Sequence, residues 1–169
     1  VCHKNSLTTT IDLGLHPLAD TFWPRETIPD EYVLLPLRVL RCDNCHHLFN
    51  EYEVSPKLRY QGVPYSYTTG NSIIAINHFY DFASQVMNIV PSKPKNVIDI
   101  GGNDGTLLSG FKKVGVENVL NIDPSENISQ ISRNSDIPTL TDFFNSKIVF
   151  KNNLTADLIV TANVLNHVD

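Results

Sequence analysis

One stretch, residues 97–108, constrains the fold of this 169-residue chain more than any other. It reads VIDIGGNDGTLL: an apolar run containing an acid, a loop with three glycines, and then a new apolar periodicity. This order predicts a β-strand, a tight turn and the start of a helix. Because glycine has no Cβ, a ligand can approach such a loop closely, and the helix start offers it free N–H groups and the positive end of a dipole.

A second apolar run, residues 119–122, ends at Asp123. Parallel strands joined by a helix bring their carboxyl ends to the same edge of a sheet, so we expect Asp123 beside the glycine loop. A carboxylate at that position can accept hydrogen bonds from both hydroxyls of a ribose. The loop and Asp123 together predict a site for a nucleoside cofactor, and the alternative is an ordinary strand–helix turn without a ligand.

The identity of the cofactor follows from how the loop departs from the dinucleotide fingerprint G-x-G-x-x-G, since Asn103 and Thr106 replace two required glycines. Residues 99–105 instead read D-x-G-x-N-x-G, which resembles the first motif of S-adenosylmethionine-dependent methyltransferases, with Asn103 at the usual middle glycine. S-adenosylmethionine carries an ammonium and a sulfonium but no pyrophosphate, so acids near the loop are useful. The predicted cofactor residues here are Asp99, Gly101, Gly102, Asn103, Asp104, Gly105, Asp123 and Pro124.

Residues 96–169 alternate between strand and helix patterns, which predicts an α/β fold with a parallel sheet covered on both faces. The strands are expected near 96–100, 118–122, 137–140 and 157–162, and the helices near 105–114, 125–133 and 145–150. Asp142 and Phe143 follow the third strand, where they can pair with and stack on an adenine; the alternative is a helix cap followed by core aromatics. Asn163 follows the fourth strand at the same edge of the sheet. Asp142, Phe143 and Asn163 are therefore also predicted to be cofactor-binding residues.

A tyrosine-containing segment precedes this region. Tyr60, Tyr65 and Tyr67 fall within eight residues. Phenol groups on a loop beside a cofactor domain can hydrogen-bond a substrate or cover an adenine, and the alternative is packing between domains. A helix is expected next, from residue 72 to residue 90, with apolar residues at three- and four-residue spacing and Asn71 as its N-cap.

The first 60 residues contain many prolines, no helical periodicity and the motif Cys42-x-x-Cys45. Two thiolates two residues apart on a tight turn can share one tetrahedral zinc ion, and Cys2 supplies a third ligand. The candidates for the fourth are a cysteine before the first residue, His3, His46 and His47. A redox pair is disfavoured because no βαβ unit surrounds the motif, and a disulfide because the cysteine count is odd; three unrelated cysteines remain the alternative. A small segment with little hydrophobic core needs a bound metal ion of this kind to fold stably.

Composition narrows the classes of partner. The chain is 41% hydrophobic and 18% charged, as in soluble globular proteins, and its net charge of −5 argues against nucleic acid as the main partner. No apolar run reaches membrane-spanning length and no signal peptide opens the chain, so we expect no membrane partner and a cytoplasmic location. Because the chain starts at Val1 and stops just after an expected buried strand, we expect it to be a piece of a longer protein.

Six stretches resemble, in the same order, the zinc-containing sugar C-methyltransferases, which act on nucleotide-linked 4-keto-deoxy sugars. These stretches are residues 13–20, 42–45, 65–69, 100–108, 122–125 and 163–168. The resemblance implies a small, β-rich zinc-binding domain over residues 1–60, a tyrosine-containing linker and helix over 61–95, and an incomplete Rossmann-like methyltransferase sheet over 96–169. It also implies a substrate domain beyond Asp169. The cysteine pattern departs from the family's four-cysteine site by one ligand.

The chemistry that the resemblance implies is S-adenosylmethionine-dependent C-methylation of a nucleotide-linked keto-deoxy sugar. A base removes the acidic proton beside the sugar ketone, and the enolate attacks the sulfonium methyl. Tyr65 and Tyr67 are the implied candidates for substrate or enolate contacts, with His167 as a third. The base is expected beyond Asp169, so residues 1–169 alone should transfer little or no methyl. Two other classes stay open: a nicotinamide-dependent enzyme, and a zinc-ribbon interaction module with an inactive Rossmann-like domain.

Overall fold

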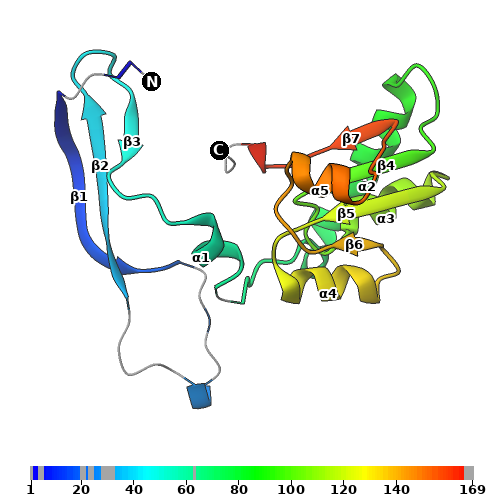
Figure 1. Ribbon diagram of the computed structural model, residues 1–169, viewed down its shortest axis with the longest axis horizontal. Coiled ribbons are helices and arrows are strands. Elements are labelled where there is room, and N and C mark those ends of the chain that lie inside the picture. The colour runs from blue at the N-terminus through cyan, green and yellow to red at the C-terminus, as the bar shows by residue number, and fades with distance from the viewer. Residues whose placement is uncertain are drawn as a thin grey trace. The chain divides into compact units, whose positions relative to one another are not determined.

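The computed structural model describes residues 2–3, 6–19, 22, 25–27, 33–62 and 64–165. The chain divides into two compact units, Val1–Val63 and Pro64–Asp169, which are drawn together in Figure 1. Residues 64–95, expected from the sequence as part of a linker and helix, belong to the same unit as the parallel sheet. None of the described helices combines the length and the apolar character that crossing a bilayer requires.

The first unit is built on a three-stranded antiparallel sheet in the order β1-β2-β3, which agrees with the β-rich segment predicted from the sequence. Its strands are β1 (Leu7–Pro17), β2 (Leu34–Cys42) and β3 (Leu48–Asn50), and it also contains a 3₁₀ turn, η1 (Arg25–Thr27), and a short helix, α1 (Pro56–Tyr60). All eleven residues of β1 are exposed, and Cys42 is the one buried hydrophobic residue among the described residues of this unit. The described part of this unit therefore has almost no hydrophobic core.

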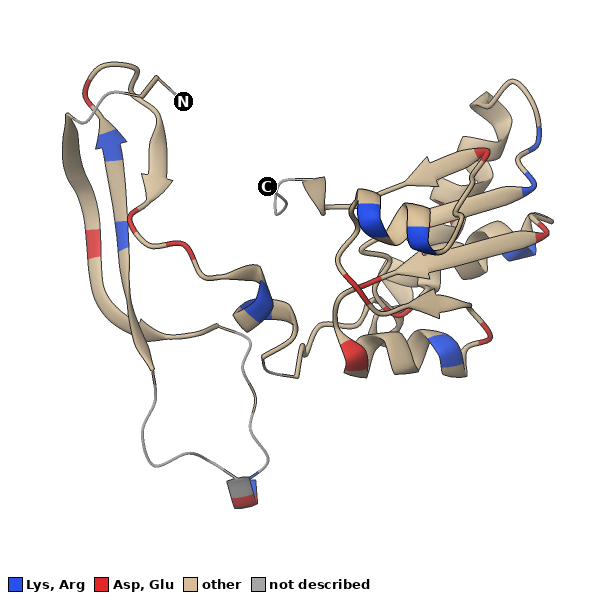
Figure 2. Cartoon of the chain, in the orientation of Figure 1, with Lys and Arg blue, Asp and Glu red and all other residues tan. Residues whose placement is uncertain are grey.

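Charged residues occur along the strands of this sheet, as the colours in Figure 2 mark, and two ion pairs link β2 to its neighbours. Arg38 of β2 lies 2.9 Å from Asp12 of β1 and 3.0 Å from Glu51, which follows β3. Both pairs are partly exposed, so each contributes little to stability. These ion pairs do not replace a hydrophobic core.

The second unit contains a four-stranded parallel sheet in the order β6-β5-β4-β7. Its strands are β4 (Asn96–Ile100), β5 (Asn118–Ile122), β6 (Thr139–Leu140) and β7 (Leu158–Val160). All four predicted strands form, which confirms the α/β class, but β6 and β7 are shorter than expected. Pro138 has no N–H for the ladder, and β7 begins one residue after Asp157, whose carboxylate accepts from the N–H groups of Lys95 and Asn96.

Helices cover both faces of this sheet, as the sequence predicts. They are α2 (Ile73–Ile89), α3 (Thr106–Lys113), α4 (Glu126–Asn134) and α5 (Ser146–Lys151), with a 3₁₀ turn, η2 (Thr69–Asn71), before α2. On one face, Ala83 of α2 and Phe111 of α3 pack in one cluster with Val97 and Val119. On the other face, Ile148 of α5 packs with Ile98 and Ile122.

The start of α2 differs from the prediction by one residue. Asn71 was expected to be the N-cap, but it lies in η2, and the side chain of Ser72 accepts the hydrogen bond from the N–H of Ala75. Both residue types suit an N-cap, so the sequence alone does not separate them.

The strand order fixes where a ligand can bind. From β4 the chain runs to β5 and β6 on one side and later to β7 on the other. In open α/β sheets this change of direction leaves a crevice outside the carboxyl ends of the strands. The glycine loop after β4, Asp123 after β5 and Asn163 after β7 all follow such carboxyl ends.

Candidate functional site

The loop between β4 and α3 requires its glycines. Gly101, Asn103 and Gly105 have positive φ angles of 67°, 52° and 81°, a region that favours glycine and, next, asparagine. A Cβ on Gly101 would lie 2.5 Å from Cγ2 of Val164, a residue that follows β7. The backbone of this loop is therefore packed against its neighbours where a side chain cannot fit.

Two buried acids lie at the carboxyl edge of the sheet. Asp99 is 2% exposed, and in the part of the chain that the structure describes no donor reaches its Oδ1 atom. Burial raises the pKa of Asp99 well above its usual value, and the nearby charge of Asp123 raises it further. A buried carboxylate oxygen without a donor is costly in free energy, so it indicates a place where a bound group supplies one.

Asp123 is 7% exposed and is already held by two backbone groups. Its Oδ2 accepts from the N–H of Asn103 at 3.1 Å and its Oδ1 from the N–H of Ser125 at 2.9 Å. Burial raises the pKa of Asp123, and the two N–H groups partly counteract this shift. The carboxylate is thus fixed beside the loop and keeps further acceptor capacity.

Asp104 has a different environment from the one that the sequence suggests. Its Oδ1 accepts from the N–H and the hydroxyl of Thr106, at 3.1 and 2.6 Å, and its Oδ2 accepts from the N–H of Gly70 at 2.6 Å. The side chain therefore caps the first turn of α3. A carboxylate stands where dinucleotide-binding folds hold a pyrophosphate at the helix N-terminus.

Two asparagines hold residues 65–70, which we call the strap. The side chain of Asn103 accepts from the N–H of Thr69 at 3.1 Å and donates to the carbonyl of Tyr67 at 3.0 Å. Asn127 of α4 likewise accepts from the N–H of Tyr65 and donates to its carbonyl. Each amide thus pairs with the strap as a neighbouring β-strand would. The strap, with α2, α3 and α4, lines a pocket of about 610 Å³.

The remaining predicted site residues follow the ends of the strands. Pro124 is half-buried after Asp123, and Asn163 is exposed after β7 with a φ of 59°. Asp142 is exposed, its Oδ1 accepts from the N–H of Phe143, and Asn145 rather than Asp142 caps α5. His167 lies outside the described residues. Asn121, a buried polar residue of β5 that contacts the loop, was not predicted from the sequence.

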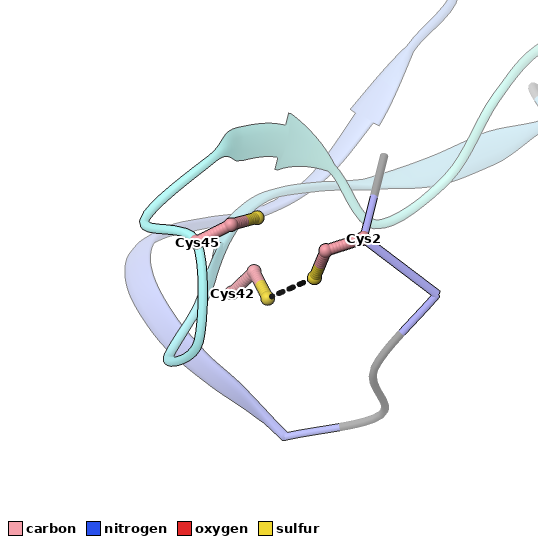
Figure 3. Close-up of side chains that lie close together, drawn as sticks. All are labelled: Cys2, Cys42 and Cys45. Carbon is pink, nitrogen blue, oxygen red and sulfur yellow. Dashed lines mark hydrogen bonds between the residues drawn. The ribbon is translucent and has the colours of Figure 1, made fainter.

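The three cysteines of the first unit converge, as the zinc hypothesis requires (Figure 3). Their Sγ atoms all lie within 4.8 Å of one another, and those of Cys2 and Cys42 are 3.4 Å apart. Thiolates on one tetrahedral zinc ion, each about 2.3 Å from it, lie about 3.8 Å apart. No histidine ring joins this cluster among the described residues, which include His3, His46 and His47.

The turn that carries Cys42 and Cys45 is closed by backbone contacts. The N–H of His46 donates to the carbonyl of Cys42 at 2.8 Å, and His46 adopts a φ of 60°. The chain just after Cys2 is tied to this turn, because the hydroxyls of Ser6 and Thr8 both donate to the Asp43 carboxylate at 2.9 Å. Asp43 therefore helps to bring a cysteine from forty positions away to the pair.

Comparisons with known proteins agree with this division of the chain. Residues 1–60 match a family described as "Putative zinc binding domain" and residues 75–169 one described as "Methyltransferase domain". A search of curated proteins finds no match.

The solved structures that match this chain include plantazolicin methyltransferase BpumL in complex with a monoazolic desmethylPZN analog and SAH. It is 20% identical, with a TM-score of 0.38, covering 48% of this chain and 32% of that one. BamL, in complex with a triazolic analog and SAH, is 18% identical with a TM-score of 0.36, covering 50% and 32%. The chain thus spans about a third of the length of these structures. Since the methyltransferase match covers more than half of the chain, the protein belongs to this methyltransferase domain family and carries a zinc-binding-type domain before it.

Proposed function

We propose that this protein binds S-adenosylmethionine at the loop after β4 and methylates a carbon atom of a nucleotide-linked keto-deoxy sugar. The observation that carries the cofactor assignment is the Oδ1 atom of Asp99, buried without a donor next to a glycine-lined loop. A bound ammonium group would supply the missing donor and stabilise the charged form of the carboxylate. S-adenosylmethionine carries such a group, and the residues present therefore fit it.

The capped start of α3 supports S-adenosylmethionine over a dinucleotide. A pyrophosphate binds at a helix N-terminus through free N–H groups. Here Asp104 occupies the N–H of Thr106, and its negative charge would repel the phosphates. This contact argues against the nicotinamide alternative, whose glycine fingerprint the sequence also lacks.

Within the proposed complex, the residues of the chain bind and orient the cofactor. Gly101, Gly102 and Asn103 would provide the backbone for its close approach, and Asp123 would accept from the ribose hydroxyls. Asp142 and Phe143 would pair with and stack on the adenine, with Pro124, Gly105 and Asn163 shaping the edges of the site. When bound, S-adenosylmethionine supplies an electrophilic sulfonium methyl group.

The sugar substrate is proposed from the six matching stretches and from the strap. Asn103 and Asn127 hold the backbone of Tyr65 and Tyr67, whose phenols are candidates to donate to a developing enolate oxygen. Tyr67 is 55% exposed, so its hydroxyl is available to a substrate. His167 remains a further candidate. The cysteine cluster is proposed to hold a structural zinc ion, because its ligands are the thiolates that closed structural sites use.

Binding measurements on the intact protein test the cofactor assignment. Calorimetry should detect S-adenosylhomocysteine and not NAD. Binding of NAD alone would support the nicotinamide alternative, and binding of neither would support the interaction module.

Transfer of a radiolabelled methyl group tests the substrate separately. Label should enter a nucleotide-linked 4-keto-deoxy sugar and resist hydrolysis, because a carbon–carbon bond has formed. The protein tested must extend past Asp169, because the base is expected there. If such a protein binds S-adenosylhomocysteine but methylates no such sugar, the substrate is refuted and the cofactor assignment is kept.

A further inference from the structure

Asn121 is a buried polar residue at a strand position that would usually be occupied by an apolar residue. It lies in β5 with an exposed fraction of 0%, on the same face as Val119, which belongs to the main hydrophobic cluster. A buried amide destabilises a fold unless its donors and acceptor are all paired. Asn121 therefore needs specific partners, and their identity indicates what it does.

The partners of Asn121 are two successive residues of the glycine loop and one residue of α4. Its Oδ1 accepts from the N–H of Gly102 at 3.1 Å. Its Nδ2 donates to the carbonyl of Asn103 at 2.7 Å and to the hydroxyl of Ser132 at 3.1 Å. One amide thus holds the two peptide groups on either side of the Gly102–Asn103 peptide bond, one through the N–H of Gly102 and the other through the carbonyl of Asn103.

The hydrogen bonds of Asn121 are linked, through Asn103, to Asp123, the predicted ribose-binding acid. While Asn121 holds the carbonyl of Asn103, the N–H of Asn103 donates to Oδ2 of Asp123. The fit is close, because a Cβ on Gly102 would lie 2.6 Å from Oδ1 of Asn121. The left-handed conformation of Asn103 is a strained one for a residue with a side chain, and it persists where its surroundings hold it.

We propose that Asn121 is a positioning residue for the cofactor: its side-chain amide fixes the glycine loop in the conformation that binds S-adenosylmethionine. This inference rests on the proposed function for the identity of the ligand. A loop held in its bound conformation does not lose conformational freedom on binding, so affinity rises. Asn121 itself touches the loop, not the reacting atoms.

The test compares Asn121→Leu with Ser132→Ala. Asn121→Leu keeps the branching at Cγ, although leucine is larger, and removes all three hydrogen bonds, whereas Ser132→Ala removes the contact outside the loop and leaves both loop contacts. Loss of two hydrogen bonds should raise the Kd of S-adenosylhomocysteine about tenfold to a hundredfold, measured on the folded fraction. Ser132→Ala should change it less than about twofold, and Asn121→Ser provides a smaller variant should the leucine prevent folding.

Hydrogen exchange gives a readout that does not depend on the ligand. The amide of Gly102 should exchange faster in both Asn121 variants than in Ser132→Ala or the wild type. Unchanged exchange at Gly102, or a wild-type Kd in the folded Asn121 variants, would overturn the positioning role. If the wild-type protein fails to bind S-adenosylhomocysteine, the proposed function fails, and the exchange comparison still decides whether Asn121 holds the loop.

Discussion

Asp99 and Asp123 lie at the carboxyl ends of two neighbouring parallel strands, and the charge of Asp123 contributes to the raised pKa of Asp99. Two buried acids side by side destabilise a protein when no cation is bound between them. We propose that cofactor binding rather than folding accounts for their presence, because a cationic group bound beside Asp99 would offset this repulsion.

The first prediction is that Asp99→Asn stabilises the cofactor-free protein near neutral pH, by about 1–3 kcal/mol, because the amide cannot ionise and so places no buried charge beside Asp123. The folded state binds the Asp99 proton more tightly than the unfolded state, whose pKa is near 3.8. The stability that Asp99 contributes is therefore fully present below that value and is lost as pH rises through the raised folded pKa. The advantage of the variant should grow over that window and shrink in acid.

Asp157 provides a control, because its replacement by asparagine should change the stability near neutral pH in the opposite direction. The N–H groups of Asn96 and Lys95 lower the pKa of Asp157, so its contribution is present above 3.8 and is lost as pH falls through the folded pKa. Asp157→Asn should thus destabilise the protein near neutral pH. Urea denaturation followed by hydrogen exchange in β4 and β5 measures both variants, because the two units need not unfold together. A lower stability of Asp99→Asn at neutral pH would contradict the prediction.

The second prediction concerns Asp123. Asp123→Ala should weaken binding of S-adenosylhomocysteine by about 1.5–3 kcal/mol, as expected for the loss of hydrogen bonds to a charged group. Part of the effect will come from the loop, because Asp123 also accepts from the N–H of Asn103. Calorimetry decides, with Asp157→Ala as a matched control that loses two backbone contacts at the other end of the sheet. Unchanged affinity in Asp123→Ala would remove this residue from the site.

Much of this architecture can be predicted from the sequence because its signals are local. The end of a strand, the glycine loop and the start of the next helix occupy twelve consecutive residues, and the periodicity changes sharply between them. The convergence of Cys2 with Cys42 was also predicted. The hydrogen bonds from Ser6 and Thr8 to Asp43, which help to bring the two cysteines together, were not predicted. Contacts of this kind depend on strand pairing, which brings distant residues together.

The role of Asn121 and the cap made by Asp104 were not predicted. An asparagine in an apolar strand shows no sign in the sequence that its amide meets a loop eighteen residues earlier. Asp104 is predicted to lie at the cofactor site because it stands beside the glycines, and nothing in the sequence indicates that its carboxylate also accepts from the N–H groups of Gly70 and Thr106. Both depend on three-dimensional contacts that neither periodicity nor composition encodes.

The third prediction concerns the metal. Purified protein should contain one zinc ion per chain, and Cys42→Ser should lose it together with the β1–β2–β3 sheet. Because Cys42 is the one buried hydrophobic residue among the described residues of that unit, zinc binding, worth roughly 10–16 kcal/mol in small zinc domains, should supply most of its stability. A chelator should have the same effect. His47→Ala is the control, since its ring is outside the cysteine cluster; retention of the sheet without metal would contradict the prediction.

The last prediction uses the close packing at Gly102. A methyl group there would lie 2.6 Å from Oδ1 of Asn121 and 2.7 Å from Oδ2 of Asp99, and these atoms belong to two neighbouring strands of the sheet. Because neither strand can move freely, the loop must shift, so Gly102→Ala should destabilise the second unit by about 1–3 kcal/mol and raise the Kd of S-adenosylhomocysteine at least about tenfold. Gly70→Ala is the matched control. Its Cβ would lie 3.1 Å from an Asp104 oxygen at an exposed position, so a smaller loss is expected. If both variants bind S-adenosylhomocysteine with the Kd of the wild type, then the loop tolerates displacement. In that case, the close packing of Gly102 against Asn121 and Asp99 does not determine the affinity.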